Sequence, residues 1–212
     1  RKVLSKRNLF PLFSAVSLLA YSALVLVDRG LGTLRGAASG QTIALYLLAF
    51  AAYLAVLVWL ERGGTWSPLW AWGTGIGSRL LLLLTTPSLS DDVYRTIWDG
   101  HVAVNGISPY AYAVNDALLD FLAIPERAIV NNAWMASPYL PVAQLLFSAA
   151  ALIGRNPILV QAIMVLLDLG AALVIANLLK FAAFPAHRLL LFLWNPLVII
   201  EVAHGAHVDA WM

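Results

Sequence analysis

Three aspartates, Asp91, Asp92 and Asp99, lie with Arg95 within nine residues and form the densest charge cluster of the chain. Only 11% of the 212 residues are charged, whereas 61% are hydrophobic. Charge is costly near lipid, so such a cluster usually lies either in a water-facing loop or in a functional site. One of two adjacent carboxylates can act as a general base, because its neighbour or a bound cation tunes its pKa. The residue types therefore predict acid–base chemistry, with Asp91 and Asp92 as the ligands of any divalent cation (Mg²⁺ or Mn²⁺).

The same spacing allows a purely structural interpretation. On a helix, Asp92, Arg95 and Asp99 would fall along one face. Asp91 and Arg95 are four residues apart and could form an ion pair. The segment could then be a solvated helix with self-neutralising charges and an acidic first turn that suits the helix dipole. Both interpretations are open at this point.

The segments around this cluster predict an all-α fold, a polytopic bundle of transmembrane helices. Six apolar segments are found, at residues 9–27, 42–60, 66–86, 140–153, 157–179 and 188–203. The first three and the fifth are long enough to cross a hydrocarbon core of about 30 Å, since a helix rises about 1.5 Å per residue. The fourth and sixth are short, and could be tilted or re-entrant. This composition excludes an ordinary soluble domain, and we expect residues 1–212 to be one transmembrane domain, the N-terminal part of a longer protein.

The charge distribution predicts the orientation of the bundle. Four basic residues and no acid open the chain, namely Arg1, Lys2, Lys6 and Arg7. The positive-inside rule places such an end in the cytoplasm. Three crossings then place residues 87–139 outside, and the acidic balance of that loop agrees with this side. We therefore expect a multi-pass membrane protein with its polar loop on the extracytoplasmic face.

The loop at 87–139 is expected to contain short helices at the membrane interface. Ser88 and Asp91 have the spacing of a capping box, which predicts a helix over 91–104 that ends at a turn. A second short helix is predicted at 116–130. Five amphipathic aromatic residues are of the type that sits at a membrane interface, namely Trp98, Tyr110, Tyr112, Trp134 and Tyr139.

After the loop, two topologies are possible. If 140–153 crosses the membrane, His204, His207 and Asp209 lie in the cytoplasm. If it is re-entrant, residues 180–188 become cytoplasmic and the histidines return to the outer face. Both possibilities are left open.

The aspartate cluster lies in a pattern that resembles a known family. Residues 89–100 (LSDDVYRTIWDG), followed by 105–110 (NGISPY), resemble the first outer loop of GT-C glycosyltransferases, in particular of bacterial polyprenyl-phosphate-mannose-dependent mannosyltransferases. Residues 137–144 (SPYLPVAQ) are similar to the Tyr-x-Pro segment of that family, although Leu140 stands where glycine or proline is more usual. Less specific similarities are found at Asp168, 194–196 and 204–209. The resemblance covers roughly residues 75–212.

The resemblance implies an inverting sugar transfer, with mannose as the expected sugar, from a polyprenyl-phosphate donor outside the cytoplasmic membrane. Asp91 would deprotonate the acceptor hydroxyl, and Asp92 would position Asp91 or the acceptor, or help to hold a cation. Arg79 or Arg95 would bind the leaving phosphate. Further candidates for substrate binding are Asp99, Tyr110, Tyr139, Gln144, Asp168, His207 and Asp209. The expected partners are the bilayer, the lipid-linked donor and a lipid or glycan acceptor, and no nucleic acid.

Several of these residues could instead have structural roles. Arg79 is close enough to the end of its apolar segment to snorkel to the surface. Asp168 could form a packing contact to another helix, and Asn195-Pro196 predicts a kink. His204, His207 and Asp209 also have the composition of a metal site. The rival function is a transporter or lipid flippase, in which Arg79 and Asp168 would bind substrate or protons inside the membrane.

Overall fold

The computed structural model describes residues 8–31, 34 and 36–208, and every regular element in this part of the chain is helical. The α-helices are α1 (Phe10–Leu31), α2 (Ser39–Glu61), α3 (Pro68–Leu82), α4 (Asp92–Val104), α5 (Pro141–Ile153), α6 (Pro157–Phe181), α7 (Leu190–Leu193) and α8 (Pro196–Ile199). A π-helical turn, Ile200–His204, follows α8. The predicted all-α membrane bundle is confirmed.

Within the described part of the chain, three helices, α1, α2 and α6, are long and apolar enough to cross a membrane. A fourth span is possible if Ala186–Leu193 and Pro196–His204 act as one, because these two pieces are bent by 48° at a short break. Asn195 lies in that break and Pro196 opens the second piece, which confirms the predicted kink. The Asn195 side chain caps α8 by accepting a hydrogen bond from the Leu197 amide.

The third apolar segment forms a shorter helix than the predicted span of 66–86. Helix α3 has 15 residues and rises only about 22 Å, less than a hydrocarbon core of about 30 Å. Ser67 is extended, as expected before Pro68. Beyond Leu82 the chain tightens into turns in which the Thr85 amide and hydroxyl both bond the Leu82 carbonyl. These two boundaries account for the shorter helix.

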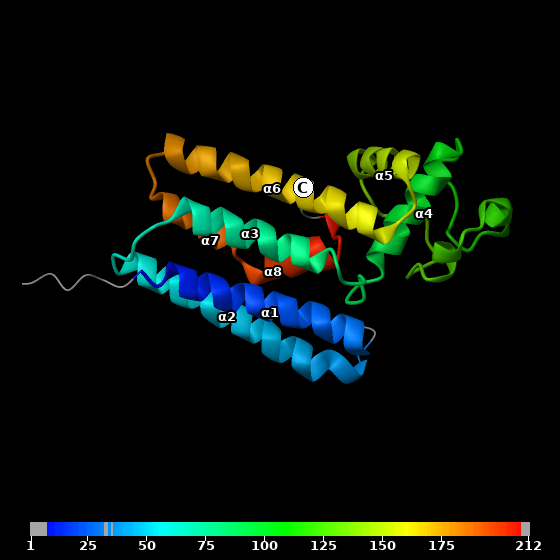
Figure 1. Cartoon of the computed structure of the whole chain (residues 1–212). Coiled ribbons are helices and arrows are strands. Elements are labelled where there is room, and N and C mark those ends of the chain that lie inside the picture. The colour runs from blue at the N-terminus through cyan, green and yellow to red at the C-terminus, as the bar shows by residue number, and fades with distance from the viewer. Residues whose placement is uncertain (1–7, 32–33, 35, 209–212) are drawn as a thin grey trace, which may run out of the picture.

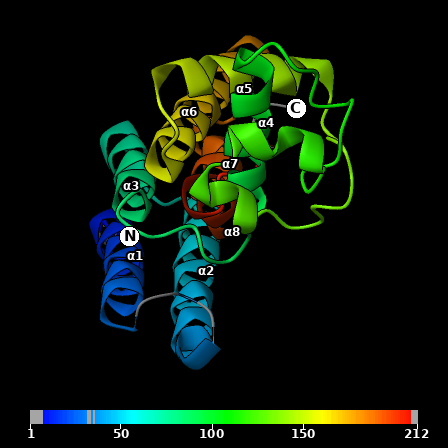
Figure 2. The same ribbon diagram turned by 90° about the vertical axis from the view of Figure 1, so that its right-hand side faces the viewer.

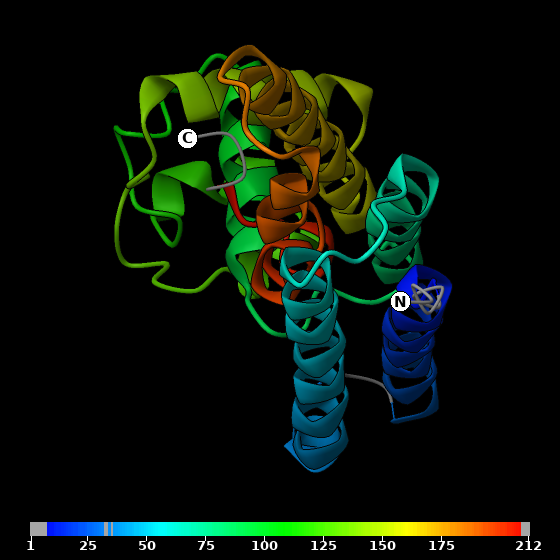
Figure 3. The same ribbon diagram turned by 90° about the vertical axis from the view of Figure 1, so that its left-hand side faces the viewer.

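The chain brings its polar segments to one end of the bundle. Figure 1 shows α1, α2, α3 and α6 running along the length of the bundle, with α4, α5 and the loop between them gathered at one end. Figure 2 looks onto this end. The opposite end, seen in Figure 3, carries the α2–α3 and α6–α7 connections.

Helix α5 does not run the length of the bundle, and this decides between the two topologies. Its 13 residues rise about 20 Å, and they pack beside α4 (Figure 1). The contact is close at Gly100, where a Cβ atom would lie 2.3 Å from the Phe147 carbonyl oxygen. Helix α6 then leads away, and α7 and α8 return the chain, so that His207 comes within 3.8 Å of Asp92. The histidine segment therefore lies at the same end as the aspartates, as the re-entrant alternative requires.

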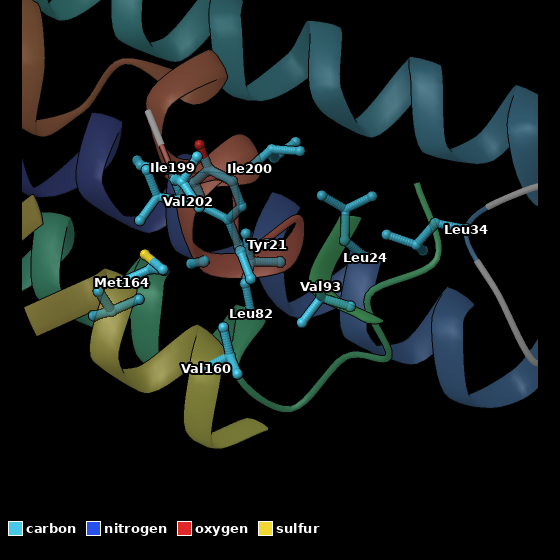
Figure 4. Packing of buried hydrophobic residues seen from close by; sticks show 14 of the residues in the cluster. Tyr21, Leu24, Leu34, Leu82, Val93, Val160, Met164, Ile199, Ile200 and Val202 are labelled. Carbon is cyan, nitrogen blue, oxygen red and sulfur yellow. The ribbon is translucent and has the colours of Figure 1, made fainter. Parts of the chain in front are cut away.

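Two apolar clusters fix the start and the body of α4. Val93 is buried in the main core beside Leu24 of α1 and Leu82 of α3 (Figure 4). Trp98 belongs to a separate cluster inside the loop, where it is 2% exposed and lies 5.1 Å beneath the Arg127 guanidinium. Trp98 is therefore packed inside the loop, and its placement at the membrane interface stays a prediction.

The predicted helix at 116–130 forms as two short 3₁₀ turns, Ala117–Leu122 and Pro125–Ala128. Pro125 lacks an amide proton and pushes the residue before it into an extended conformation, so one continuous helix cannot form. Arg127 holds the two turns together by an ion pair with Asp120 and a hydrogen bond to the Asp116 carbonyl oxygen.

Candidate active site

The aspartate pair opens α4, with Asp91 as the N-cap residue and Asp92 as the first helical residue. The helix agrees with the prediction, but the capping box was wrong. The Ser88 hydroxyl accepts a hydrogen bond from the Leu34 amide, and the Ser90 hydroxyl accepts one from the Asp92 amide at 3.2 Å. Both carboxylates are half-buried at the helix N-terminus, where the helix dipole favours negative charge.

Asp92 lies next to residues that are distant in the sequence. Its Oδ1 accepts a hydrogen bond from Asn131 Nδ2 at 2.8 Å. Its Oδ2 lies 3.8 Å from His207 Nδ1, whose other ring nitrogen lies 3.4 Å from Glu201 Oε2. The imidazole thus lies between two carboxylates. His207 was predicted, whereas Asn131 and Glu201 were missed, because no sequence motif marks them.

The other charges of α4 are buried in a separate network. Arg95 pairs with Asp99 at 2.8 Å and donates to the Met135 carbonyl oxygen. Asp99 also accepts a hydrogen bond from Gln144 Nε2 at 3.0 Å. Burial raises the pKa of Asp99, and the nearby Arg95 opposes that rise. Asp99 and Gln144 therefore join α4 to α5, and roles for these residues in substrate binding stay predictions.

Arg79 and Asp168 face each other inside the bundle. They form an ion pair in which both side chains are fully buried. Arg79 Nη1 also donates to the carbonyl oxygens of Gly75 at 2.9 Å and Leu193 at 2.8 Å. Gly75 allows this close approach, since a Cβ atom there would lie 2.6 Å from Leu193 Cγ. Arg79 therefore does not snorkel. It joins α3, α6 and α7, and Asp168 makes the contact to another helix that was the structural alternative for it.

Two tyrosines connect the segment that follows α4 to the start of α5. The Tyr110 hydroxyl donates to the Tyr139 carbonyl oxygen at 2.7 Å. The Tyr139 ring packs edge-on against Phe147 of α5. Tyr110 remains exposed at the surface of this end of the bundle. Substrate binding by either tyrosine stays a prediction.

Residues 12–212 match the family described as alpha-(1->6)-mannopyranosyltransferase, N-terminal domain. The chain belongs to this mannosyltransferase family. The match covers nearly the whole sequence, including α4 and both partners of the buried ion pair. It confirms the class of enzyme that the resemblance implied, and it removes the support for a transporter or flippase. No curated protein and no solved structure matches the chain.

The mannosyltransferase has a cavity of about 230 Å³ between α6 and the broken α7–α8 segment. Its polar lining residues are Asp168, Glu201 and His207, and Leu197 and Val198 contribute apolar walls. Because His207 also lies beside Asp92, the cavity adjoins the aspartate pair.

Among the residues that the structure describes, no group of three or more His, Asp and Glu side chains could hold a metal ion. Asp209, the third member of the predicted metal-type cluster, lies outside the described residues. The His204 ring contacts Thr85 and Ser88. Asp91 and Asp92 still offer two adjacent carboxylates, a set that suits Mg²⁺ when substrate phosphates complete its ligands.

Proposed function

We propose that this mannosyltransferase uses a polyprenyl-phosphate-linked mannose as donor and works by inversion at the outer face of the cytoplasmic membrane. The acceptor would be a lipid or a glycan. The observation that carries the proposal is the place of Asp91 and Asp92. They are half-buried at the start of a helix, at the end of a membrane bundle, whereas Asp99 nearby is buried and paired with Arg95.

In the proposed reaction, Asp91 takes the proton of the acceptor hydroxyl. The acceptor oxygen then forms a bond to the anomeric carbon, and the bond from that carbon to the phosphate oxygen breaks on the opposite side. Polyprenyl phosphate leaves with the electron pair, and the anomeric configuration inverts. Asp92, held by Asn131 and beside His207, positions the acceptor or Asp91. General-base catalysis of this kind typically contributes about 10²–10⁴-fold.

We propose that the cavity beside the aspartates receives the lipid-linked donor. The walls of this cavity include Phe192, Leu197 and Val198, and the Leu197 side chain is half-exposed. The lipid chain of the donor is proposed to leave the site along these apolar walls. The leaving phosphate requires positive charge. The proposed sources of this charge are Arg95, Arg79 and a divalent cation bound by Asp91 and Asp92. Each arginine would then bind the phosphate and its present carboxylate partner at the same time.

The donor is tested directly with membranes that contain the full-length protein. Radiolabelled polyprenyl-phosphate-mannose should pass its label to lipid or glycan acceptors without any nucleotide sugar, because the activated sugar is already on the lipid. Membranes without the protein serve as the control. Transfer that requires a nucleotide-linked mannose and ignores the lipid-linked one would refute the proposed donor.

The side of the membrane is tested by labelling, since the sequence contains no cysteine. Asn115 is exposed in the loop, so Asn115→Cys should react with an impermeant thiol reagent in intact cells. Lys180→Cys, at the opposite end of the bundle, is the matched control and should react only after the membrane is permeabilised. The reverse pattern would place the aspartates in the cytoplasm.

A further inference from the structure

We propose that His204 is a positioning residue for the aspartate pair, a role that rests on the proposed function of Asp91. His204 is fully buried. Its Nε2 atom lies 3.2 Å from the Ser88 amide and 3.4 Å from the Leu89 amide, and its Nδ1 atom lies 2.7 Å from the Thr85 hydroxyl. One imidazole therefore contacts both ends of the segment that leads into Asp91.

The hydrogen bonds fix the tautomer of this ring. Both backbone amides can only donate, so Nε2 must be the unprotonated acceptor. The Thr85 hydroxyl donates its own proton to the Leu82 carbonyl oxygen at 2.6 Å, and it must therefore accept from Nδ1–H. All three contacts are satisfied by a neutral His204 with its proton on Nδ1.

The segment from Thr85 to Ser90 has no regular structure of its own, so its shape depends on contacts of this kind. Asp28 of α1 supplies a second anchor by accepting a hydrogen bond from the Thr86 amide at 2.9 Å. A third anchor is the Ser88 hydroxyl, which accepts a hydrogen bond from the Leu34 amide. His204 is the anchor nearest in sequence to Asp91, since it bonds the Leu89 amide two residues earlier. Loss of this anchor would displace Asp91 relative to a bound substrate.

The π-helical turn places His204 in this position. The Gly205 amide bonds the Ile200 carbonyl oxygen at 3.0 Å, and Gln161 Nε2 of α6 donates to the carbonyl oxygens of Ala203 and His204. A Cβ atom at position 205 would lie 2.8 Å from the Glu201 carbonyl oxygen, so glycine suits the turn. Single π turns inside helices are frequent at functional sites. The broken C-terminal span thereby carries both His207, beside Asp92, and His204, behind Asp91.

Two conservative substitutions separate the contacts of the ring. In His204→Gln, the amide oxygen can replace Nε2 and accept the Ser88 and Leu89 amides. In His204→Asn, the shorter amide can replace Nδ1 and reach only Thr85. We expect His204→Asn in the full-length protein to lower kcat by about 10²-fold, the cost of a misplacement near 1 Å, with the donor KM unchanged. His204→Gln should retain most of the activity, and Thr85→Val should cause a smaller loss of the same kind.

A spin label on Leu89→Cys reports the segment itself, independently of catalysis. Its mobility should rise in combination with His204→Asn and stay unchanged with His204→Gln. His187→Asn is the matched control, because this histidine pairs with Glu61 at the other end of the bundle, and its activity and label mobility should equal those of the wild type.

Equal activity of the Asn and Gln variants at position 204, or an unchanged label mobility in His204→Asn, would overturn the positioning role. If the label becomes mobile as expected while Asp91→Asn still transfers mannose, the positioning role stands and the assignment of Asp91 as the base fails.

Discussion

Replacing Asp91 by asparagine should lower mannosyl transfer by at least about 10²-fold, the lower end of a general-base contribution. Asparagine keeps the size and much of the hydrogen-bonding capacity of aspartate, but it cannot take the acceptor proton. Because Asp91 is half-buried at the helix start, rather than deep in the core, the variant should fold and insert normally. The initial rate of label transfer in membranes, normalised to the amount of folded protein, measures the effect.

Asp120→Asn is the matched control, because Asp120 lies in the same loop with its side chain 69% exposed. It should transfer mannose at the wild-type rate. The transfer rate of Asp92→Asn should lie between those of Asp91→Asn and Asp120→Asn if Asp92 only positions Asp91. If Asp92→Asn is inactive while Asp91→Asn is not, the two roles must be exchanged.

The second large effect concerns stability. Arg79→Ala should destabilise the protein by about 3–5 kcal/mol, because it leaves a buried carboxylate at Asp168 without its partner. The same change also removes the hydrogen bonds to the carbonyl oxygens of Gly75 and Leu193. We expect a lower yield of folded protein and a lower unfolding temperature in detergent.

A double variant distinguishes this stability effect from a role in donor binding. Replacing both partners of a buried pair by apolar residues of similar volume is often close to neutral. Arg79→Met combined with Asp168→Leu should therefore regain much of the lost stability. If the double variant is stable but binds the donor poorly, the phosphate role predicted for Arg79 is supported. Wild-type stability of Arg79→Ala alone would contradict the structural role of the ion pair.

Local signals account for what could be predicted from the sequence. The length and apolarity of α1, α2 and α6 specify spans without reference to the rest of the chain. Helix α4 was predicted almost to its ends, since Asn105 and Gly106 stop it and Gly106 has a φ of +80°. The motif around Asp91 indicated the family, which the match over residues 12–212 shows.

The contacts of the site could not be predicted in this way, because they depend on how distant helices pack. Asn131 reaches Asp92 across 39 residues, and Arg79 reaches Asp168 across 89. A charge within an apolar helix stands out in a sequence, so both members of the latter pair were identified individually. Their pairing depends on the register of α3 against α6, and no local sequence pattern predicts that register.

The buried pair between α3 and α6 also constrains how the protein is made. An unpartnered arginine costs about 2.5–3.5 kcal/mol when a helix passes from the translocon into lipid, and α3 is short. Its partner on α6 leaves the ribosome 89 residues later. Helix α3 is therefore poorly retained by lipid alone, and its stable insertion must await α6. Two elements distant in the chain are thus expected to enter the membrane as one cooperative unit during biosynthesis.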